Sequence, residues 1–373
     1  MAKGVGGVWP DVSVIIPHYN NHGMLARVIA AVRAQDYEGA VEIVVADDGS
    51  EQLPAPAGVT VVAQEDRGFR AAAARNLGAR AATGEVLAFL DGDTLPEPGY
   101  LRAVVPHIQR NRRALVVGSR LTGPEREEPG WLRQAWSRTG DLSRADSTSW
   151  RYIISAVLTC SARFFRHVGG FDASLVGYGG EDWEFGWRTW NAGAQFVHEP
   201  AARAVHPEPD YGARGDDAWQ VKNAESVALA HRITHPIARP RGVAFDAADV
   251  AVVAPGFHEP GVSEAVIASW LLADAHVYVP EVPELFSSDA RVSAGPPRGE
   301  RIRVELRRPW ALSEPETFYR RVTDRHLVCA DGTRVVTARA RALTQPAERT
   351  RGELLGLKLL EAPQRLERLF GGW

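Results

Sequence analysis

The stretch from Val86 to Thr94 constrains the fold of this chain more than any other. Five apolar residues, Val86 to Leu90, run directly into Asp91-Gly92-Asp93. A continuous apolar run that stops at turn residues is typical of a parallel strand covered on both faces. In open α/β sheets, ligands bind beyond the carboxyl ends of such strands, where these two carboxylates would lie. Carboxylates in that place can hold Mg²⁺ or Mn²⁺ and, through the ion, phosphate oxygens, although Asp-Gly is also common in plain surface turns.

The segments before this strand repeat the same pattern. A second strand also ends in acids, Asp47-Asp48-Gly49-Ser50. Regular alternation of strands and helices predicts right-handed crossovers and a mostly parallel sheet. Pro17 ends the first strand at the point where a dinucleotide site would need a glycine-rich loop, so NAD binding is disfavoured. The predicted strands are Val12–Pro17, Val41–Ala46 and Val59–Ala63, and the predicted helices are Met24–Gln35 and Arg70–Ala82.

Length and composition limit the classes of protein that this can be. The 373 residues predict two domains or one large one, and a net charge of −3 gives no reason to expect a nucleic-acid partner. Two cysteines, Cys160 and Cys329, form no disulfide framework and no metal-binding spacing. The first ten residues lack the features of a signal peptide, and no apolar run reaches the length of a membrane span. We therefore expect a cytoplasmic protein without a transmembrane segment, and the Ala- and Arg-rich composition suggests a bacterial source.

The middle of the chain is less regular. Ala114–Ser119 and Ile153–Leu158 are predicted strands, and Phe164–Val168 is a predicted short helix. Between the two strands, residues 121–150 are rich in Arg, Glu, Pro and Trp and are interpreted as a long polar loop beside the site.

A second dense motif begins with two glycines before a predicted helix. Glu181 and Asp182 occupy the first turn of that helix, where the helix dipole favours anions, so we expect both to keep low pKa values. Ordinary stabilisation of a helix terminus is the alternative role for them. Tryptophans recur at helical spacing and form one stripe, which is typical of a core face. The stripe consists of Trp183, Trp187 and Trp190.

Four motifs in this order and spacing resemble the family 2 glycosyltransferases, which have the GT-A fold. The resemblance covers roughly residues 10–210. It implies binding of a UDP-sugar. The motifs are residues 14–20, Asp47-Asp48-Gly49-Ser50, Gly68-Phe69-Arg70 with Arg75-Asn76, and Asp91-Gly92-Asp93.

The resemblance also implies a role for each donor-site residue. Pro17 and Tyr19 would frame the uridine, and Asp48, with Asp47 as the alternative, would accept a hydrogen bond from the base. Arg75 would lie near the base or the diphosphate. The plainer alternatives are a loop aromatic for Tyr19 and a solvated helix charge for Arg75.

Farther along the motif, Asp91 would face the ribose or the sugar, and Asp93 would bind a divalent cation, Mn²⁺ or Mg²⁺. His206 lies where the GT-A enzymes carry a third metal ligand. Its rival is His198, at the end of a predicted strand over residues 194–197, and a histidine in that position is more often structural.

Residues 169–188 resemble the corresponding segment of galactosyltransferase-like and chondroitin-polymerase-like GT-A enzymes. In those inverting enzymes the aspartate after the glutamate is the catalytic base, which implies this role for Asp182. Glu181 would hold a hydroxyl of the donor or acceptor sugar. Trp183 would contact the acceptor, with burial in the core as the alternative.

The remainder of the chain resembles no family that we recognise. Residues 216–235 predict an amphipathic helix, and Pro236, Pro240 and Gly242 mark a linker. Residues 245–373 are interpreted as a smaller α/β domain that ends in a long helix, Glu353–Phe370. We therefore expect a GT-A domain over residues 10–236 and an accessory domain over residues 245–373. The accessory domain would bind the acceptor or form a homo-oligomer.

The expected function is that of an inverting, metal-dependent glycosyltransferase. It would move a sugar from a UDP-sugar to a nucleophile on a glycan, a peptide side chain or a metabolite. One alternative is a catalytically inactive module that binds nucleotide-sugars or carbohydrate. Another is a nucleotidyltransferase on the same fold, which would need a basic glycine-rich loop where residues 17–21 stand. The sequence does not specify the sugar, the acceptor or whether the product is a polymer.

Overall fold

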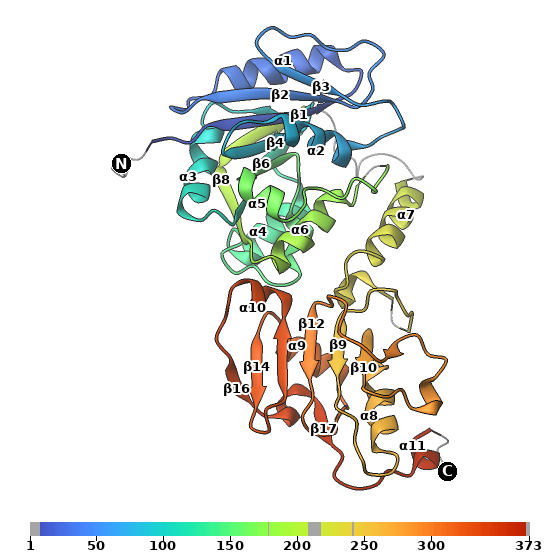
Figure 1. The fold of residues 1–373 in the computed structure, drawn as a ribbon. Coiled ribbons are helices and arrows are strands. Elements are labelled where there is room, and N and C mark those ends of the chain that lie inside the picture. The colour runs from blue at the N-terminus through green and yellow to red at the C-terminus, as the bar shows by residue number, and fades with distance from the viewer. Residues whose placement is uncertain (1–7, 178, 208–217, 241, 371–373) are drawn as a thin grey trace. The chain divides into compact units, whose positions relative to one another are not determined.

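The computed structural model describes residues 8–370 apart from 178, 208–217 and 241, and the chain divides into two compact units (Figure 1). The first unit comprises the chain up to Trp190 together with Ala194–Ala228. The second comprises Leu229–Trp373 together with Asn191–Gly193. No helix in the described part of the chain has both the length and the apolar character needed to cross a membrane.

The first unit is built on a mixed sheet of eight strands in the order β3-β2-β1-β4-β7-β6-β8-β5. The four strands β1 to β4 are parallel, and β7 runs antiparallel to both of its neighbours, β4 and β6. This confirms the predicted α/β class with a mostly parallel sheet. The strands are β1 (Val12–His18), β2 (Val41–Asp47), β3 (Thr60–Ala63), β4 (Val86–Leu90), β5 (Leu95–Pro96), β6 (Ala114–Thr122), β7 (Val157–Ser161) and β8 (Gln195–His206).

Helices pack on this sheet because each carries one apolar face. All five residues of β4 are buried, as expected for a strand covered on both sides. Gly78 lets helix α2 approach the sheet closely, since a Cβ there would lie 2.6 Å from Ile15 Cγ2. The helices are α1 (His22–Arg33), α2 (Ala71–Ala81), α3 (Tyr100–Arg110), α4 (Gly130–Thr139), the 3₁₀ turn η1 (Ser149–Tyr152), α5 (Ala162–His167), α6 (Glu181–Asn191) and α7 (Ala218–Ala230).

Three features of this unit differ from the sequence-based expectation, one being that the strand predicted over Ile153–Leu158 begins only at Val157. Residues 121–150 are not one long loop, because they contain α4 and the start of η1. Helix α4 buries Leu132, Ala135 and Trp136 on one face, a short apolar pattern hidden among charged residues. In addition, β8 does not stop after Val197. It pairs in parallel with β6 as far as His206, with a shift in register after Gly118.

The second unit has its own sheet of seven strands, ordered β11-β10-β9-β12-β15-β14-β16, and a two-stranded pair, β13 with β17. Trp270 and Phe318 are the largest of the fully buried side chains in its core. The strands are β9 (Val250–Val253), β10 (Ala275–Tyr278), β11 (Val292–Ser293), β12 (Ile302–Glu305), β13 (Trp310–Leu312), β14 (His326–Cys329), β15 (Arg334–Thr337), β16 (Glu348–Thr350) and β17 (Leu357–Leu359). The helices are η3 (Pro236–Ala238), α8 (Val262–Trp270), η4 (Glu284–Phe286), α9 (Pro315–Val322), α10 (Ala338–Ala342), η5 (Gly352–Leu355) and α11 (Leu366–Phe370).

The long C-terminal helix predicted over Glu353–Phe370 is wrong. The segment forms η5, the strand β17 and only then the short helix α11. Gly356 has a φ of 71° and packs so closely that a Cβ would lie 2.6 Å from Glu314 O, which stops a helix there. Leu357 then pairs with Leu312 in the two-stranded sheet. The helix expected over residues 216–235 is shorter, since α7 ends at Ala230 and residues 216–217 lie outside the described residues.

Candidate active site

The two acids after β2 shape the loops at the carboxyl end of the sheet. Asp47 Oδ1 accepts hydrogen bonds from the backbone N–H groups of Gly49 (3.0 Å) and Ser50 (2.8 Å), and its Oδ2 accepts from Ser50 Oγ at 2.6 Å. Gly49 is required in this turn, because its φ is 91° and a Cβ would lie 2.4 Å from Asp66 N. The Asp47 carboxylate is therefore largely engaged in holding the turn.

Asp48 has more capacity left for a ligand. Its Oδ2 accepts from the backbone N–H of Arg70 at 2.7 Å, and its Oδ1 accepts from Gln64 Nε2 at 2.5 Å. A carboxylate has about four acceptor positions, of which Asp48 uses two and Asp47 three in these bonds. Of the two acids considered as hydrogen-bond acceptors for the nucleobase, Asp48 therefore has more acceptor positions left for a ligand.

Tyr19 follows Pro17 at the end of β1 and is about half exposed, at 51%. Its hydroxyl donates to Asp66 Oδ2 at 3.2 Å, which fixes the ring at the rim of the sheet. A cavity of about 320 Å³ lies beside it, lined by Asn20, His22, Glu51 and Gln52. Tyr19 is thus an aromatic ring on the surface at the end of the strand, outside the core.

Arg75 is buried and joins two parts of the site. Its Nη2 donates to Asp91 Oδ1 at 2.6 Å and its Nη1 donates to Glu181 Oε1 at 2.9 Å, with the guanidinium 5.6 Å from the Phe171 ring centre. Burial acts to lower the pKa of Arg75, but the charges of Asp91 and Glu181 outweigh it and raise the pKa. The alternative of a solvated helix charge is therefore wrong. Arg75 brings the end of β4 against the start of α6.

The pKa of Asp182 is raised, whereas the sequence led us to expect a low value. Burial, and then the charge of Glu181, raise the pKa of Asp182 to about 7, against the lowering effects of Arg75 and a hydrogen bond with Ser155. Its Oδ1 is enclosed without a hydrogen-bond partner. The expected low pKa is wrong for Asp182, because removal of water from the carboxylate favours its neutral form.

Asp93 and His206 meet although they are far apart in the sequence. His206 Nε2 lies 3.1 Å from Asp93 Oδ2 at the ends of β8 and β4. Burial would raise the pKa of Asp93, but the hydrogen bond and charge of His206 and the charge of Arg120 lower it. This contact places one carboxylate and one imidazole side by side.

The side chains of Asp93 and His206 suit a divalent cation whose remaining coordination positions are filled by water and substrate oxygens. No group of three or more His, Cys, Asp or Glu side chains that could hold a metal occurs among the residues that the structure describes. Mg²⁺ and similar ions are commonly held by one or two carboxylates, with water and phosphate oxygens in the remaining positions. An imidazole beside the carboxylate suits Mn²⁺ better than Mg²⁺.

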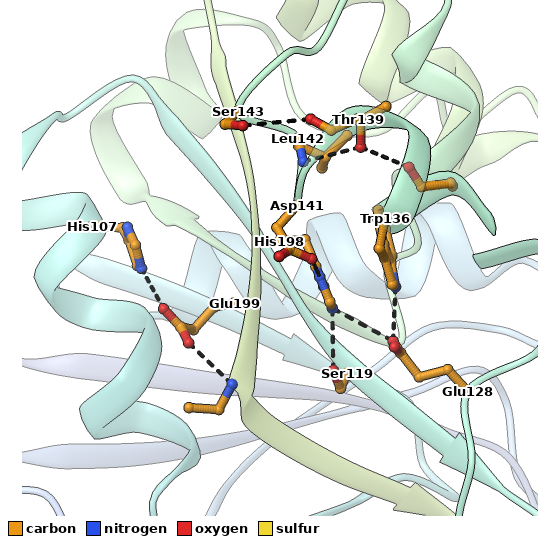
Figure 2. A network of polar contacts seen from close by, with 12 residues as sticks. His107, Ser119, Glu128, Trp136, Thr139, Asp141, Leu142, Ser143, His198 and Glu199 are labelled. Carbon is orange, nitrogen blue, oxygen red and sulfur yellow. Dashed lines mark hydrogen bonds and ion pairs between the residues drawn. The ribbon is translucent and has the colours of Figure 1, made fainter. Parts of the chain in front are cut away.

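His198, the rival of His206, belongs to a separate polar network (Figure 2). Its Nδ1 bonds Asp141 Oδ1 at 2.7 Å and its Nε2 bonds Ser119 Oγ at 3.1 Å. The ring stacks on Trp136 with centroids 4.0 Å apart. Both ring nitrogens are therefore engaged, and His198 is not beside Asp93. Because β8 continues past it, His198 lies within the strand and not at its end.

The three tryptophans of the α6 stripe differ in their exposure to solvent. Trp187 and Trp190 are buried, whereas Trp183 is partly exposed with its ring 5.9 Å from that of Trp150. Lys222 Nζ lies 5.6 Å from the centre of the Trp183 ring. The indole is thus packed between an aromatic ring and a cation.

Two residues of α7 belong near this site and were missed from the sequence. They are Lys222, over Trp183, and Glu225, to which Lys222 is bonded at 2.7 Å. Glu225 Oε2 would lie 2.8 Å from a Cβ on Gly179, so α7 approaches the glycines before α6. No local motif marks either residue, and only the packing of α7 reveals them.

Comparison with known proteins agrees with this geometry. Residues 13–168 match the family described as glycosyl transferase family 2, and residues 139–208 match the family described as the N-terminal domain of galactosyltransferase. A pre-mycofactocin glycosyltransferase of Mycobacterium tuberculosis is 32% identical over 208 residues, covering 52% of this chain and 42% of that protein. A validoxylamine A glucosyltransferase of Streptomyces hygroscopicus subsp. limoneus is 33% identical over 216 residues, covering 48% of each protein.

A chondroitin synthase of Escherichia coli is 24% identical over 265 residues, covering 60% of this chain and 38% of that protein. The chain spans less than half the length of each of these three relatives. The matched residues coincide with the first unit and with the motifs at the ends of β1, β2 and β4. The resemblance seen in the motifs is therefore confirmed: residues 13–168 form a domain that matches glycosyl transferase family 2, and residues 139–208 match the N-terminal domain of galactosyltransferase.

Proposed function

We propose that this chain is an inverting glycosyltransferase that moves a sugar from a UDP-sugar to a hydroxyl or similar nucleophile of an acceptor, and that it needs Mn²⁺ or Mg²⁺. The observation that carries the proposal is the meeting of four segments at the carboxyl end of β4. Arg75 links Asp91 to Glu181, and Asp93 contacts His206. A diphosphate and a sugar both need such a cluster of charged groups at one edge of a sheet.

In this proposal Asp182 is the general base. A base works best when its pKa lies near the working pH, and the pKa of Asp182 is raised to about 7. Asp182 would take the proton from the acceptor while the acceptor oxygen attacks the anomeric carbon from the side opposite the diphosphate. Glu181, held by Arg75, would orient a sugar hydroxyl next to it.

The donor would be held by the acids at the strand ends. Asp48 would accept from the base, with Pro17 and Tyr19 against the uridine, and Asp91 would face the ribose or the sugar. Asp93 and His206 would hold the cation. When bound, the cation supplies positive charge that stabilises the leaving diphosphate.

The proposal does not assign the chemical identity of the acceptor. The names of the relatives range from a validoxylamine A glucosyltransferase to a chondroitin synthase. Trp183 is the residue that we assign to the acceptor, because it is the partly exposed end of an otherwise buried stripe beside Asp182. A cytoplasmic location is part of the proposal and is supported by two free, buried cysteines. Association through the second unit stays a prediction that a mass measurement in solution would test.

A UDP-release assay tests the proposal. The full chain would be incubated with a panel of UDP-sugars and Mn²⁺, Mg²⁺ or EDTA. We expect release with at least one donor, only with a cation, and loss of release in Asp182→Asn. Asp36→Asn is the matched control, since Asp36 is exposed and forms an ion pair with Arg102 at the surface. Absence of UDP release with every donor would favour the inactive module instead.

A further inference from the structure

Three neighbouring parallel strands of the first unit bring different chemical groups to one edge of the sheet. In the order β3-β2-β1, the residues that follow their carboxyl ends are Gln64, Asp48 and Tyr19. The backbone holds these ends together, since Gln64 N–H donates to Asp47 O at 3.0 Å. Asp48 N–H donates in the same way to His18 O at 2.8 Å. Of the three side chains at this edge, only that of Gln64 has no role in the proposed transfer.

The orientation of the Gln64 amide is fixed by the carboxylate of Asp48. Gln64 Nε2 lies 2.5 Å from Asp48 Oδ1. An ionised carboxylate only accepts hydrogen bonds, so the nitrogen of the amide faces Asp48 and the oxygen does not. The second N–H of Nε2 donates to no other residue in the described part of the chain. Because Gln64 is partly exposed, this donor is left for a ligand.

Asp48 offers an acceptor beside this donor. Its carboxylate accepts from Gln64 and from the backbone N–H of Arg70 at 2.7 Å, which leaves about two of its acceptor positions. Asp48 is only 6% exposed, so a ligand that meets the open part of the carboxylate also meets the amide bonded to it. The edge therefore presents one acceptor and one donor side by side.

Tyr19 adds a flat ring next to this pair. The ring is half exposed, and its hydroxyl donates at 3.2 Å to Asp66, which is two residues after Gln64. The loops that carry these groups pack closely, because a Cβ on Gly49 would lie 2.4 Å from Asp66 N. An aromatic face bordered by a donor and an acceptor suits a planar ring with polar groups along one edge, such as a nucleobase.

The order of polar groups along the edge of the base decides which base fits. Uracil carries a ring N–H between two C=O groups, so it can donate to Asp48 and accept from Gln64 in either direction along the edge. Cytosine has an unprotonated ring nitrogen in that place, and its lone pair would face the Asp48 carboxylate. Guanine has a C=O on only one side of its ring N–H, and adenine has no ring N–H on that edge. Uracil is therefore the base that fits in both directions.

We propose that Gln64 selects uracil at the donor site, where its amide donates to a C=O of the base while Asp48 accepts from the ring N–H. The proposal rests on the UDP-sugar donor proposed above and adds the residue that discriminates against cytidine nucleotides. Gln64 takes no part in holding the diphosphate or in proton transfer. Its replacement should therefore change which nucleotide binds.

The test is isothermal titration calorimetry of the full chain with UDP and with CDP, both in Mn²⁺. The two nucleotides carry the same ribose and diphosphate, so the ratio of their dissociation constants reports on the base alone. We expect CDP to bind the parent protein at least about tenfold more weakly than UDP. Gln64→Met nearly keeps the length of the side chain and removes the donor. It should weaken UDP binding about three- to tenfold, the effect of one lost hydrogen bond, and CDP binding less than about twofold.

Two further variants separate recognition of the base from support of the fold. Gln109→Met is the matched control, because Gln109 is exposed on α3 and its amide reaches Val8, before the amino end of β1. It should leave both affinities unchanged. Gln64→Asn withdraws the donor by one methylene group and should also weaken UDP binding more than CDP binding, which provides the measurement if Gln64→Met does not fold.

Three results would overturn the proposal: equal losses of UDP and CDP affinity in the Gln64 variants, equal affinity of the parent protein for the two nucleotides, or no UDP binding at all. The outcomes also separate this inference from the proposed function. Selective UDP binding without UDP release from any UDP-sugar would contradict the proposed function alone. UDP release by a parent protein that binds UDP and CDP equally would contradict the role of Gln64 alone.

Discussion

The replacement Asp182→Asn should change stability and catalysis in opposite directions. The amide matches the carboxyl group in size and stays neutral at every pH, so it imitates protonated Asp182. The pKa of this residue is raised from 3.8 to about 7 in the folded chain. The folded protein therefore holds a proton on Asp182 between about pH 4 and pH 7 that the unfolded chain releases. A carboxyl group of this kind destabilises the fold increasingly as the pH rises through that window.

The size of the effect follows from the shift. One pKa unit corresponds to about 1.4 kcal/mol, so a shift of about three units gives a penalty of at most about 4 kcal/mol at pH 8. At pH 5, little more than one unit of the window has been crossed, and the penalty is about 2 kcal/mol. Asp182→Asn removes both penalties. Its stability gain over the parent protein should therefore be larger at pH 8 than at pH 5 by about 2 kcal/mol.

Thermal melts at pH 5 and pH 8 measure this difference, and any change from the amide's own contacts cancels between them. In a unit of this size, about 2 kcal/mol corresponds to a difference of roughly 4 to 8 °C in melting temperature. UDP release by the same variant should fall by about 10² to 10⁴, the usual effect of removing a general base. Release by the parent enzyme should rise with pH to a plateau above about 7.

Two results would refute the reasoning. An equal stability change at both pH values would show that the carboxyl group is not kept protonated by burial. UDP release by Asp182→Asn at nearly the parental rate would show that Asp182 is not the general base. Glu184 is then a poor substitute, because it is buried and bonded to Arg188 at 2.6 Å, so Glu181 would be examined next.

Three other substitutions test the remaining parts of the site. Asp93→Ala should remove the dependence of UDP binding on Mn²⁺, and equal calorimetric affinity of the parent protein in EDTA and Mn²⁺ would contradict the metal assignment. Arg75→Met should lower the free energy of unfolding by about 3 to 5 kcal/mol in urea titrations, because it leaves two carboxylates without their cation, whereas Arg67→Met at an exposed ion pair should change it by less than about 1 kcal/mol. Gly49→Ala should destabilise the protein and weaken UDP binding, because the turn held by Asp47 needs a φ of 91°; a variant with parental UDP affinity would show that this turn does not form the base site.

The local pattern of the sequence determined much of the first unit. Apolar runs that stop at acids gave strands such as β4, and helical spacing of apolar residues gave α1 and α2, because these signals depend on neighbours within a few residues. The same local reasoning failed where tertiary contacts override it. Helix α4 is hidden among charges, and the leucines near the C-terminus go into β17 because Leu312 offers them a partner strand.

Only the tertiary structure decided how the site residues act on one another. Arg75 and Glu181 are 106 positions apart, and Asp93 and His206 are 113 apart, so no local pattern reports their contacts. The pKa of Asp182 depends first on how much water the fold removes from it, which no local pattern reports. His198 and His206 differ in role for the same reason. Both are histidines of β8, and only the three-dimensional fold places one on Trp136 and the other on Asp93.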